Sequence, residues 1–202
     1  LYLDAFAQDS EAVIARARAA CDFVLLPNID EASLGPLQAL AAAHPGFALP
    51  MMGLHPCSVG ADFAPVLARL RALLFANPTG YAAVGECGID LYWDKTTLAA
   101  QQAALATQLG WAAALGAPVS LHSREAFAET LAVVREAQDG RLRGVFHCFT
   151  GTEAEGRAAI GEGFALGIGG VITYKNSHAL REAVAALPRE AIVLETDAPY
   201  LP

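Results

Sequence analysis

Short apolar runs alternate with longer amphipathic or alanine-rich stretches along this chain, and this alternation restricts the possible folds more than any other sequence feature. Each run has five to seven residues and ends in polar residues or glycine, which predicts a buried strand. The predicted strands cover Asp22–Pro27, Phe47–Gly53, Tyr81–Glu86, Ala117–His122, Arg143–His147, Phe164–Gly169 and Ala191–Thr196. The stretches around them predict helices over Ser10–Ala20, Ser33–Ala43, Asp62–Phe75, Thr97–Leu115, Ser123–Gln138, Thr152–Gly161 and Ser177–Leu187.

Two of these helices carry start signals. Ser123 precedes Arg-Glu-Ala, and Thr152 has Glu155 three residues further on, which is a capping-box pattern. No linker, low-complexity segment or charge block divides the chain. We therefore expect residues 1–202 to form a single domain.

Strands that alternate with helices build a parallel sheet covered by helices, either as an open doubly wound sheet or as a closed barrel. An open sheet usually has a glycine-rich phosphate loop after its first strand, but the nearest match, Gly163–Gly170, is part of a predicted strand. We therefore expect an α/β fold of the TIM-type (β/α)8 barrel class. A complete barrel has about 250 residues. Because seven strands are predicted, we expect an eighth before Leu1.

Composition excludes several classes of protein. Hydrophobic residues make up 54% of the chain and charged residues only 17%, so a disordered chain is excluded. The longest small or apolar stretch, Gly110–Leu121, is shorter than the roughly 18 residues that suggest a membrane span. We expect no membrane association. A net charge of −8 argues against a broad basic surface for nucleic acid.

The four cysteines form no CxxC pair and show no clustered spacing. Free thiols are typical of a reducing compartment, and the chain shows no secretory leader. We therefore expect a cytoplasmic protein with unpaired cysteines.

Histidine and acidic residues occur where predicted strands end. Glu86, His122, His147 and Asp197 each end or follow a different strand. Functional residues of parallel α/β folds gather at the carboxyl ends of strands, and imidazole and carboxylate groups are ligands of divalent metals. A single histidine here could be a core residue, and Asp197 could cap a turn, but an unpaired buried Glu86 would be costly. Together the four residues predict a metal site.

Other candidates have simpler alternatives. Arg124 and Lys175 are candidate phosphate contacts, although solvated surface charges are an equal interpretation. His44 sits at a helix end and is interpreted as structural. The cysteines at positions 57, 87 and 148 are interpreted as small packing residues rather than ligands.

Six segments resemble the TatD-type metal-dependent hydrolases, barrel deoxyribonucleases related to the amidohydrolases. They are GLHP (53–56), GECGIDLYWDK (85–95), LHSREAF (121–127), GVFHCFTG (144–151), LGIGGVITYKNS (166–177) and LETDAPYLP (194–202). The resemblance covers the chain from Leu1 to its end. The family carries a His-x-His pair directly before a segment like Leu1–Asp4 and continues past LETDAPYLP. We therefore expect the first strand and the closing helices to lie outside residues 1–202, leaving the first metal position short of ligands.

The resemblance implies roles for these residues. Glu86 would bridge two divalent cations (Mg, Mn or Zn), and His122 and His147 would complete the second cation site. Asp197 would ligate the first cation and assist proton transfer, so that Glu86 and Asp197 are the catalytic residues. His55 and Lys175 would line the substrate pocket.

The predicted reaction is hydrolysis of a phosphodiester in DNA. Two cations would lower the pKa of a water molecule and stabilise charge on the phosphoryl oxygens, while the outer surface stays acidic. Ends or single strands are the expected substrates, and no obligate protein partner is evident. One alternative is an amidohydrolase-type enzyme acting on a small amide, lactone or deaminase substrate, because a barrel with metals does not define its reaction. Another is a catalytically inactive interaction protein.

Overall fold

Seven parallel strands form one sheet and follow each other in chain order. The structure is a computed structural model that describes residues 1–201. The strands are β1 Val24–Leu26, β2 Ala48–Met52, β3 Ala83–Asp90, β4 Val119–Arg124, β5 Gly144–Phe146, β6 Phe164–Ile168 and β7 Ile192–Leu194. The α-helices are α1 Ser10–Ala20, α2 Leu34–Ala43, α3 Phe63–Ala76, α4 Leu98–Leu115, α5 Phe127–Ala137, α6 Glu153–Gly161 and α7 His178–Ala186.

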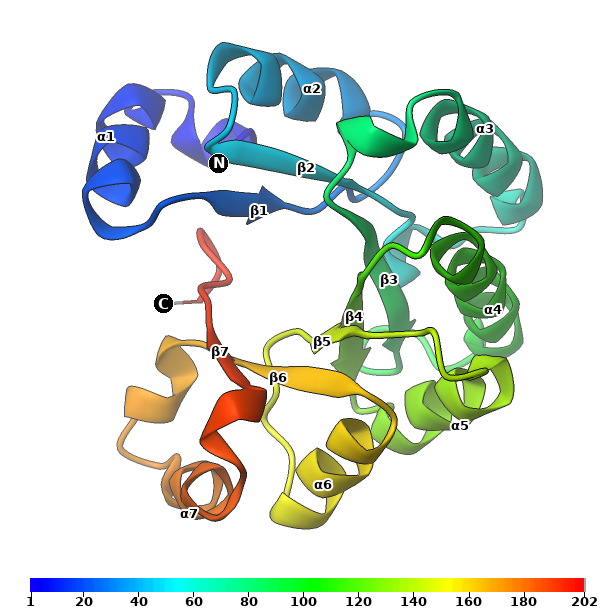
Figure 1. The fold of residues 1–202 in the computed structure, drawn as a ribbon, viewed down its shortest axis with the longest axis vertical. Coiled ribbons are helices and arrows are strands. Elements are labelled where there is room, and N and C mark those ends of the chain that lie inside the picture. Colours follow the sequence, from blue (N-terminus) through cyan, green and yellow to red (C-terminus); the bar gives the residue numbers. More distant parts are fainter. Residues whose placement is uncertain (202) are drawn as a thin grey trace.

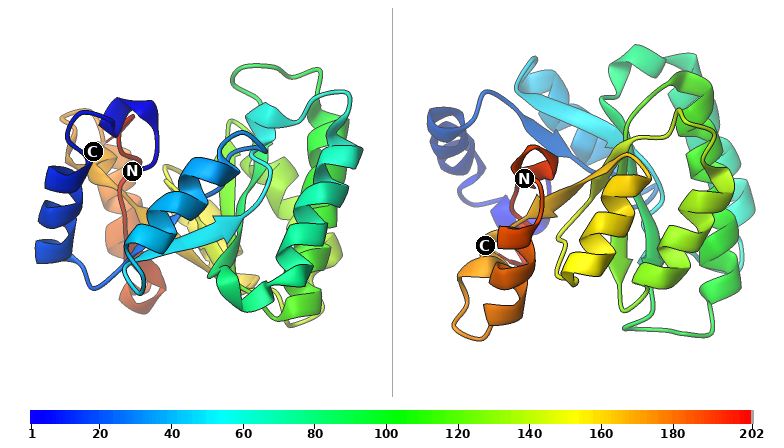
Figure 2. Two further views of the ribbon diagram at one scale, coloured as in Figure 1. Left: turned by 90° about the horizontal axis from the view of Figure 1, so that it is seen from above. Right: turned by 60° about the horizontal axis from the view of Figure 1, so that its bottom comes forward.

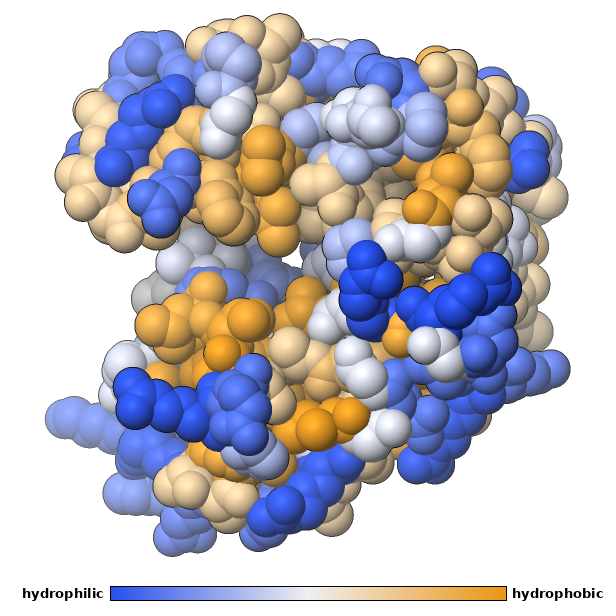
Figure 3. All heavy atoms as spheres, in the orientation of Figure 1, coloured by the Kyte–Doolittle hydropathy of each residue, from blue (hydrophilic) through white to orange (hydrophobic). Residues whose placement is uncertain are grey.

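The sheet curls into an incomplete ring with the helices on its outside, as Figures 1 and 2 show. This arrangement confirms the expected α/β fold of the TIM-barrel type. Within residues 1–201, β1 and β7 are the edge strands, and each pairs with one neighbour. Apolar surface lies on both sides of the opening between these edges in Figure 3, and Leu25 and Leu194 are exposed there.

The core lies between the curled sheet and its outer helices. All eight residues of β3 are buried, which makes β3 the most enclosed strand. Large apolar side chains from β4 to β6 and from α4 pack around it, among them Leu105, Leu109, Leu121, Phe146 and Phe164. A buried parallel sheet of this kind explains why the predicted strands are continuous apolar runs rather than alternating ones.

Two element boundaries differ from the prediction by four residues, and the others differ by two residues or fewer. The strand β3 continues to Asp90, and α5 begins at Phe127 rather than at Ser123. The reason is pairing between strands, because Ser123 and Arg124 lie in register with Ile89 and Asp90. A serine that looks like a helix cap in the sequence is therefore held in the sheet by its neighbour strand.

Two other local predictions are confirmed. Thr152 and Glu155 form a complete capping box at the start of α6. The glycine-rich segment 163–170 contains β6 and is not a strand-to-helix phosphate loop. All four cysteines are unpaired, with Cys87 buried and Cys148 partly buried. Within residues 1–201, no helix combines the length and apolar character that crossing a membrane requires.

Candidate metal centre

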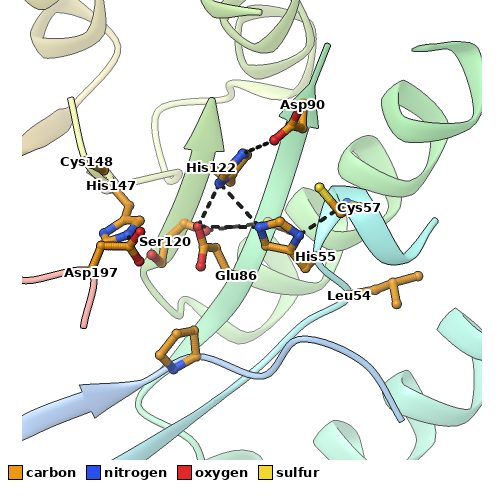
Figure 4. A network of polar contacts seen from close by, with 12 residues as sticks. Leu54, His55, Cys57, Glu86, Asp90, Ser120, His122, His147, Cys148 and Asp197 are labelled. Carbon is orange, nitrogen blue, oxygen red and sulfur yellow. Dashed lines mark hydrogen bonds and ion pairs between the residues drawn. The ribbon is translucent and has the colours of Figure 1, made fainter. Parts of the chain in front are cut away.

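Three ligand-type side chains meet at the carboxyl end of the sheet. Glu86 comes from β3, His122 comes from β4, and His55 follows β2 directly before the short 3-10 helix Pro56–Ser58. Figure 4 shows the three side chains pointing toward one another. Parallel strands place their carboxyl ends at one edge, which is why residues far apart in the sequence converge here.

The distances within this cluster suit a single cation. His122 Nδ1 lies 3.1 Å from Glu86 Oε1, and His55 Nε2 lies 3.3 Å from His122 Nδ1 and 4.0 Å from Glu86 Oε1. Ligand atoms about 2.0–2.2 Å from one ion are at most about 4.4 Å apart. All three spacings fall below that limit, so one ion can contact all three residues.

Asp90 fixes the orientation of His122. The Nε2 atom of His122 lies 2.9 Å from Asp90 Oδ2, which leaves Nδ1 facing Glu86 Oε1. When Nε2–H donates to Asp90, the Nδ1 lone pair and the carboxylate oxygen are both acceptors. Two acceptors that face each other at 3.1 Å need a proton or a metal ion between them. A carboxylate behind a histidine is the usual partner of a metal-bound imidazole.

Asp90 was not among the predicted site residues, although the sequence contains a signal for it. Glu86 and Asp90 are four residues apart in one strand, so both side chains lie on the same face of the sheet. Gly88 lies between them with a φ of 152°, and a Cβ added there would lie 1.9 Å from the His122 carbonyl oxygen. Glycine at this position therefore allows β3 to approach the strand that carries His122.

The cluster is strongly polarised. Burial alone would raise the pKa of Glu86, but the hydrogen bond from His122 and the nearby His147 and His55 outweigh it and lower the pKa to about 2. Burial would lower the pKa of His122, but hydrogen bonds to Asp90 and Glu86 raise it to about 9. Burial dominates at His55 and lowers its pKa to about 4. The site therefore holds ionised carboxylates that attract a cation.

A second group of residues lies beside the first. The Nε2 atom of His147, just after β5, lies 3.4 Å from Asp197 Oδ1, and its Nδ1 atom lies 2.9 Å from Glu195 Oε2. Glu195 also accepts a hydrogen bond from the backbone N–H of Cys148. These two acidic partners outweigh burial and raise the pKa of His147 to about 11. In Figure 4, His147 and Asp197 lie on the side of Glu86 opposite His55.

Glu195 is a further residue that the sequence reasoning missed. A Cβ on Gly167 would lie 2.2 Å from the Glu195 carboxylate, so glycine in β6 leaves space for that side chain. The signal was its spacing, because Glu195 and Asp197 are two residues apart at the end of one strand run. Such spacing suggests two side chains on the same side of the sheet.

The predicted ligands therefore lie at the same edge of the sheet. Their contacts place them in two groups that differ from the predicted pair of cation sites. Glu86 and His122 group with His55, which was predicted as a substrate contact, while His147 pairs with Asp197. This difference arises from the register of β2, β3 and β4, which brings the end of β2 next to His122.

Of the two predicted phosphate contacts, Arg124 lies at the carboxyl end of a strand and Lys175 lies in a segment further along the chain. Arg124 is the last residue of β4 and is exposed. Lys175 is exposed in the segment that joins the 3-10 helix Gly170–Thr173 to α7. Among residues 1–201, no polar contact joins Lys175 to either histidine group.

Comparisons with known proteins agree with this arrangement. A family model described as "TatD related DNase" matches residues 1–202. A protein of Pantoea ananatis named "3'-5' ssDNA/RNA exonuclease TatD" is 38% identical over 198 residues, covering 97% of this chain and 75% of that protein. A protein of Cronobacter turicensis with the same name is 39% identical, covering 97% and 74%. The crystal structure of a TatD homologue from Escherichia coli superimposes with a TM-score of 0.90 at 31% identity, covering 99% of this chain and 77% of that chain. The chain belongs to the TatD-related DNase family, whose members are metal-dependent hydrolases of phosphodiester bonds.

Proposed function

We propose that this protein is a metal-dependent exonuclease that removes nucleotides from the ends of single-stranded DNA or RNA. The observation that carries the proposal is the cluster of His55, Glu86 and His122 at the carboxyl edge of the sheet. Family membership supports the reaction class, and the names of the curated relatives support the single-stranded substrate.

Two divalent cations would occupy the site. Glu86, His122 and His55 would hold one, and His147, Asp197 and Glu86 would hold the other. To ligate through Nε2, His55 would carry its ring hydrogen on Nδ1, so the 3.2 Å hydrogen bond that Nδ1 accepts from the Cys57 N–H would be lost. The imidazole donors suit Zn²⁺, and the carboxylates suit Mg²⁺ or Mn²⁺.

When bound, the cations supply positive charge for the phosphoryl oxygens and lower the pKa of the attacking water. The residues of the chain perform the remaining tasks. Asp197, whose side chain is 37% exposed, accepts the proton from the water. Asp90 and Glu195 hold the rings of His122 and His147 in place through the contacts described above.

The charge distribution supports ends and single strands over long duplexes. The net charge is −8, so the outer surface repels a phosphate backbone at long range. Attraction for phosphate is limited to the edge of the sheet that would carry the cations. Arg124 and Lys175 would bind phosphates there. A substrate is therefore held over a few nucleotides, and its binding weakens with salt.

We also propose that residues 1–202 belong to one hydrolase domain, that the protein works in the cytoplasm, and that it needs no protein partner. The single sheet through the chain supports the domain assignment. Four unpaired cysteines support a reducing compartment.

The test is a cleavage assay on end-labelled single-stranded DNA, single-stranded RNA and duplex DNA with Mg²⁺, Mn²⁺ or Zn²⁺. We expect shortening of single strands from one end, complete loss of activity in EDTA, and recovery when the cation is restored. In Glu86→Gln the cleavage rate should fall by more than about 100-fold. Changing a residue that only positions a metal ligand typically costs about 10- to 100-fold, so the larger loss would identify Glu86 as a ligand itself.

The control is Glu136→Gln, which changes an exposed glutamate of α5 away from the site and should leave the rate unchanged. Circular dichroism should show the same fold in both variants. Intact single strands with every cation would overturn the proposed function. Hydrolysis of amide or lactone substrates alone would instead favour the amidohydrolase reaction.

A further inference from the structure

Two adjacent aromatic residues are exposed where β3 ends. Tyr92 is 49% exposed and Trp93 is 72% exposed, although both follow the fully buried β3. Their ring centroids are 4.8 Å apart with an interplanar angle of 90°, so one ring packs edge-on against the other. The exposed indole is therefore supported by its neighbour, although the protein core does not cover it.

Arg124 lies over the ring of Tyr92. Its guanidinium carbon lies 3.8 Å from the Tyr92 ring centroid and 5.7 Å from that of Trp93, which is cation–π geometry. Among residues 1–201, the Arg124 side chain makes no hydrogen bond or ion pair with another residue. Its N–H donors are therefore available to a ligand while stacking holds the guanidinium in place.

The two aromatic residues are linked to the metal cluster through one side chain. Asp90 Oδ1 accepts hydrogen bonds from the backbone N–H groups of Tyr92, at 2.9 Å, and Trp93, at 3.4 Å. Asp90 Oδ2 lies 2.9 Å from His122 Nε2, and Figure 4 shows this contact beside the cluster. Arg124 follows His122 by two residues in β4. The aromatic pair therefore has a fixed position relative to the metal cluster.

We propose that Trp93, supported by Tyr92, is a stacking site for an unpaired base of the strand being cleaved, and that Arg124 binds the neighbouring phosphate. This inference rests on the proposed function and names the part of the substrate that the platform recognises. Every base has a π-face, so stacking on an aromatic ring gives affinity without sequence preference. A base inside a duplex has both faces covered by its neighbours. The platform therefore favours single strands.

The charges around the platform fit this ligand. A guanidinium that lies against an aromatic ring offers both a donor for phosphate and a cation for the π-face of a base. Lys95 lies two residues beyond Trp93, but its Nζ is 3.9 Å from Glu125, which balances its charge. Arg124 therefore supplies the positive charge of the platform.

The experiment compares two fluorescently labelled probes of ten nucleotides each, oligo(dT) and an abasic oligomer with the same phosphate backbone. Binding to the full chain is measured by fluorescence anisotropy in EDTA, where the probe stays intact. Trp93→Ala should weaken binding of oligo(dT) by about 5- to 100-fold, which corresponds to the usual stacking contribution of one base. The abasic probe should bind Trp93→Ala and the parent protein equally.

Three further measurements separate stacking from a structural effect. Trp93→Phe should restore most of the binding to oligo(dT), because phenylalanine also stacks. Oligo(dT) should quench the indole fluorescence of the parent protein but not of Trp93→Phe, since the other tryptophan, Trp111, is buried. Phe23→Ala is the matched control, because Phe23 is an exposed aromatic residue at the amino end of β1, away from the metal cluster. This variant should bind oligo(dT) like the parent protein.

Cleavage kinetics with the divalent cation distinguish this inference from the proposed function. Trp93→Ala should raise the KM for single-stranded DNA and leave kcat nearly unchanged. A parent protein that cleaves single strands while Trp93→Ala shows the same Kd and KM would overturn the stacking site alone. Equal losses on oligo(dT) and the abasic probe would also overturn it. A parent protein that neither binds nor cleaves single strands would overturn both.

Discussion

Asp90 joins two parts of the site through one carboxylate. One oxygen orients the His122 ring, and the other accepts the backbone N–H groups of Tyr92 and Trp93. In Asp90→Asn the charge is lost, so His122 becomes a weaker metal ligand. We expect metal affinity to fall by about 10- to 100-fold. Calorimetric titration with Mn²⁺ measures this affinity directly.

Asp94→Asn is the matched control for that change. Asp94 is exposed, and within residues 1–201 its carboxylate accepts hydrogen bonds only from Thr96 in its own turn, so the variant should bind Mn²⁺ like the parent. Activity of Asp90→Asn should recover at high metal concentration, because the ligands themselves remain. Equal Mn²⁺ affinity in the two variants would show that Asp90 does not act on the metal through His122.

At the scale of elements, the capping box of α6 is a local feature with a measurable contribution to stability. Thr152 Oγ1 accepts from the Glu155 N–H, and Glu155 Oε2 accepts from the Thr152 N–H at 2.7 Å. Thr152→Ala should lower the free energy of unfolding by about 0.5–2 kcal/mol. In a chain of this size the melting temperature changes by roughly 2–4 °C per kcal/mol, so calorimetry resolves the loss.

The control for Thr152→Ala is Thr107→Ala, which changes a threonine in a different helix. Thr107 is exposed in the interior of α4, and its hydroxyl donates to the Ala103 carbonyl of the same helix. Alanine has the higher helix propensity, so this variant should melt no lower than the parent. A Thr152→Ala protein that also melts like the parent would mean that the cap contributes nothing in this fold.

At the scale of the whole molecule, the distribution of thiols gives an overall test of the fold. Cys21 and Cys57 are exposed, whereas Cys87 is completely buried in β3. A thiol reagent should therefore modify Cys21 in the native protein and leave Cys87 protected. Cys57 should react slowly although it is exposed, because partial burial of the thiol and the nearby Asp90 raise its pKa to about 11. After denaturation without reductant, four thiols should react. Two or fewer reactive thiols in protein kept from air would contradict the cytoplasmic assignment.

The positions of the elements could be predicted from the sequence because their causes are local. Each buried parallel strand needs a continuous apolar run, and each outer helix needs one apolar face, so the alternation is visible in the residues themselves. The capping box at Thr152 depends on residues three positions apart. The start of α5 could not be predicted in this way, because pairing with β3 holds Ser123 and Arg124 in a strand.

The sequence by itself determined which residue types stand at the strand ends, and therefore that Glu86, His122, His147 and Asp197 are candidates for one edge of a sheet. Only the tertiary structure decided their partners. Strand register and sheet curvature place His55 against His122 and Glu195 against His147, and these side chains come from segments many residues apart. Such contacts depend on where backbones lie in space, which local propensity and spacing do not encode.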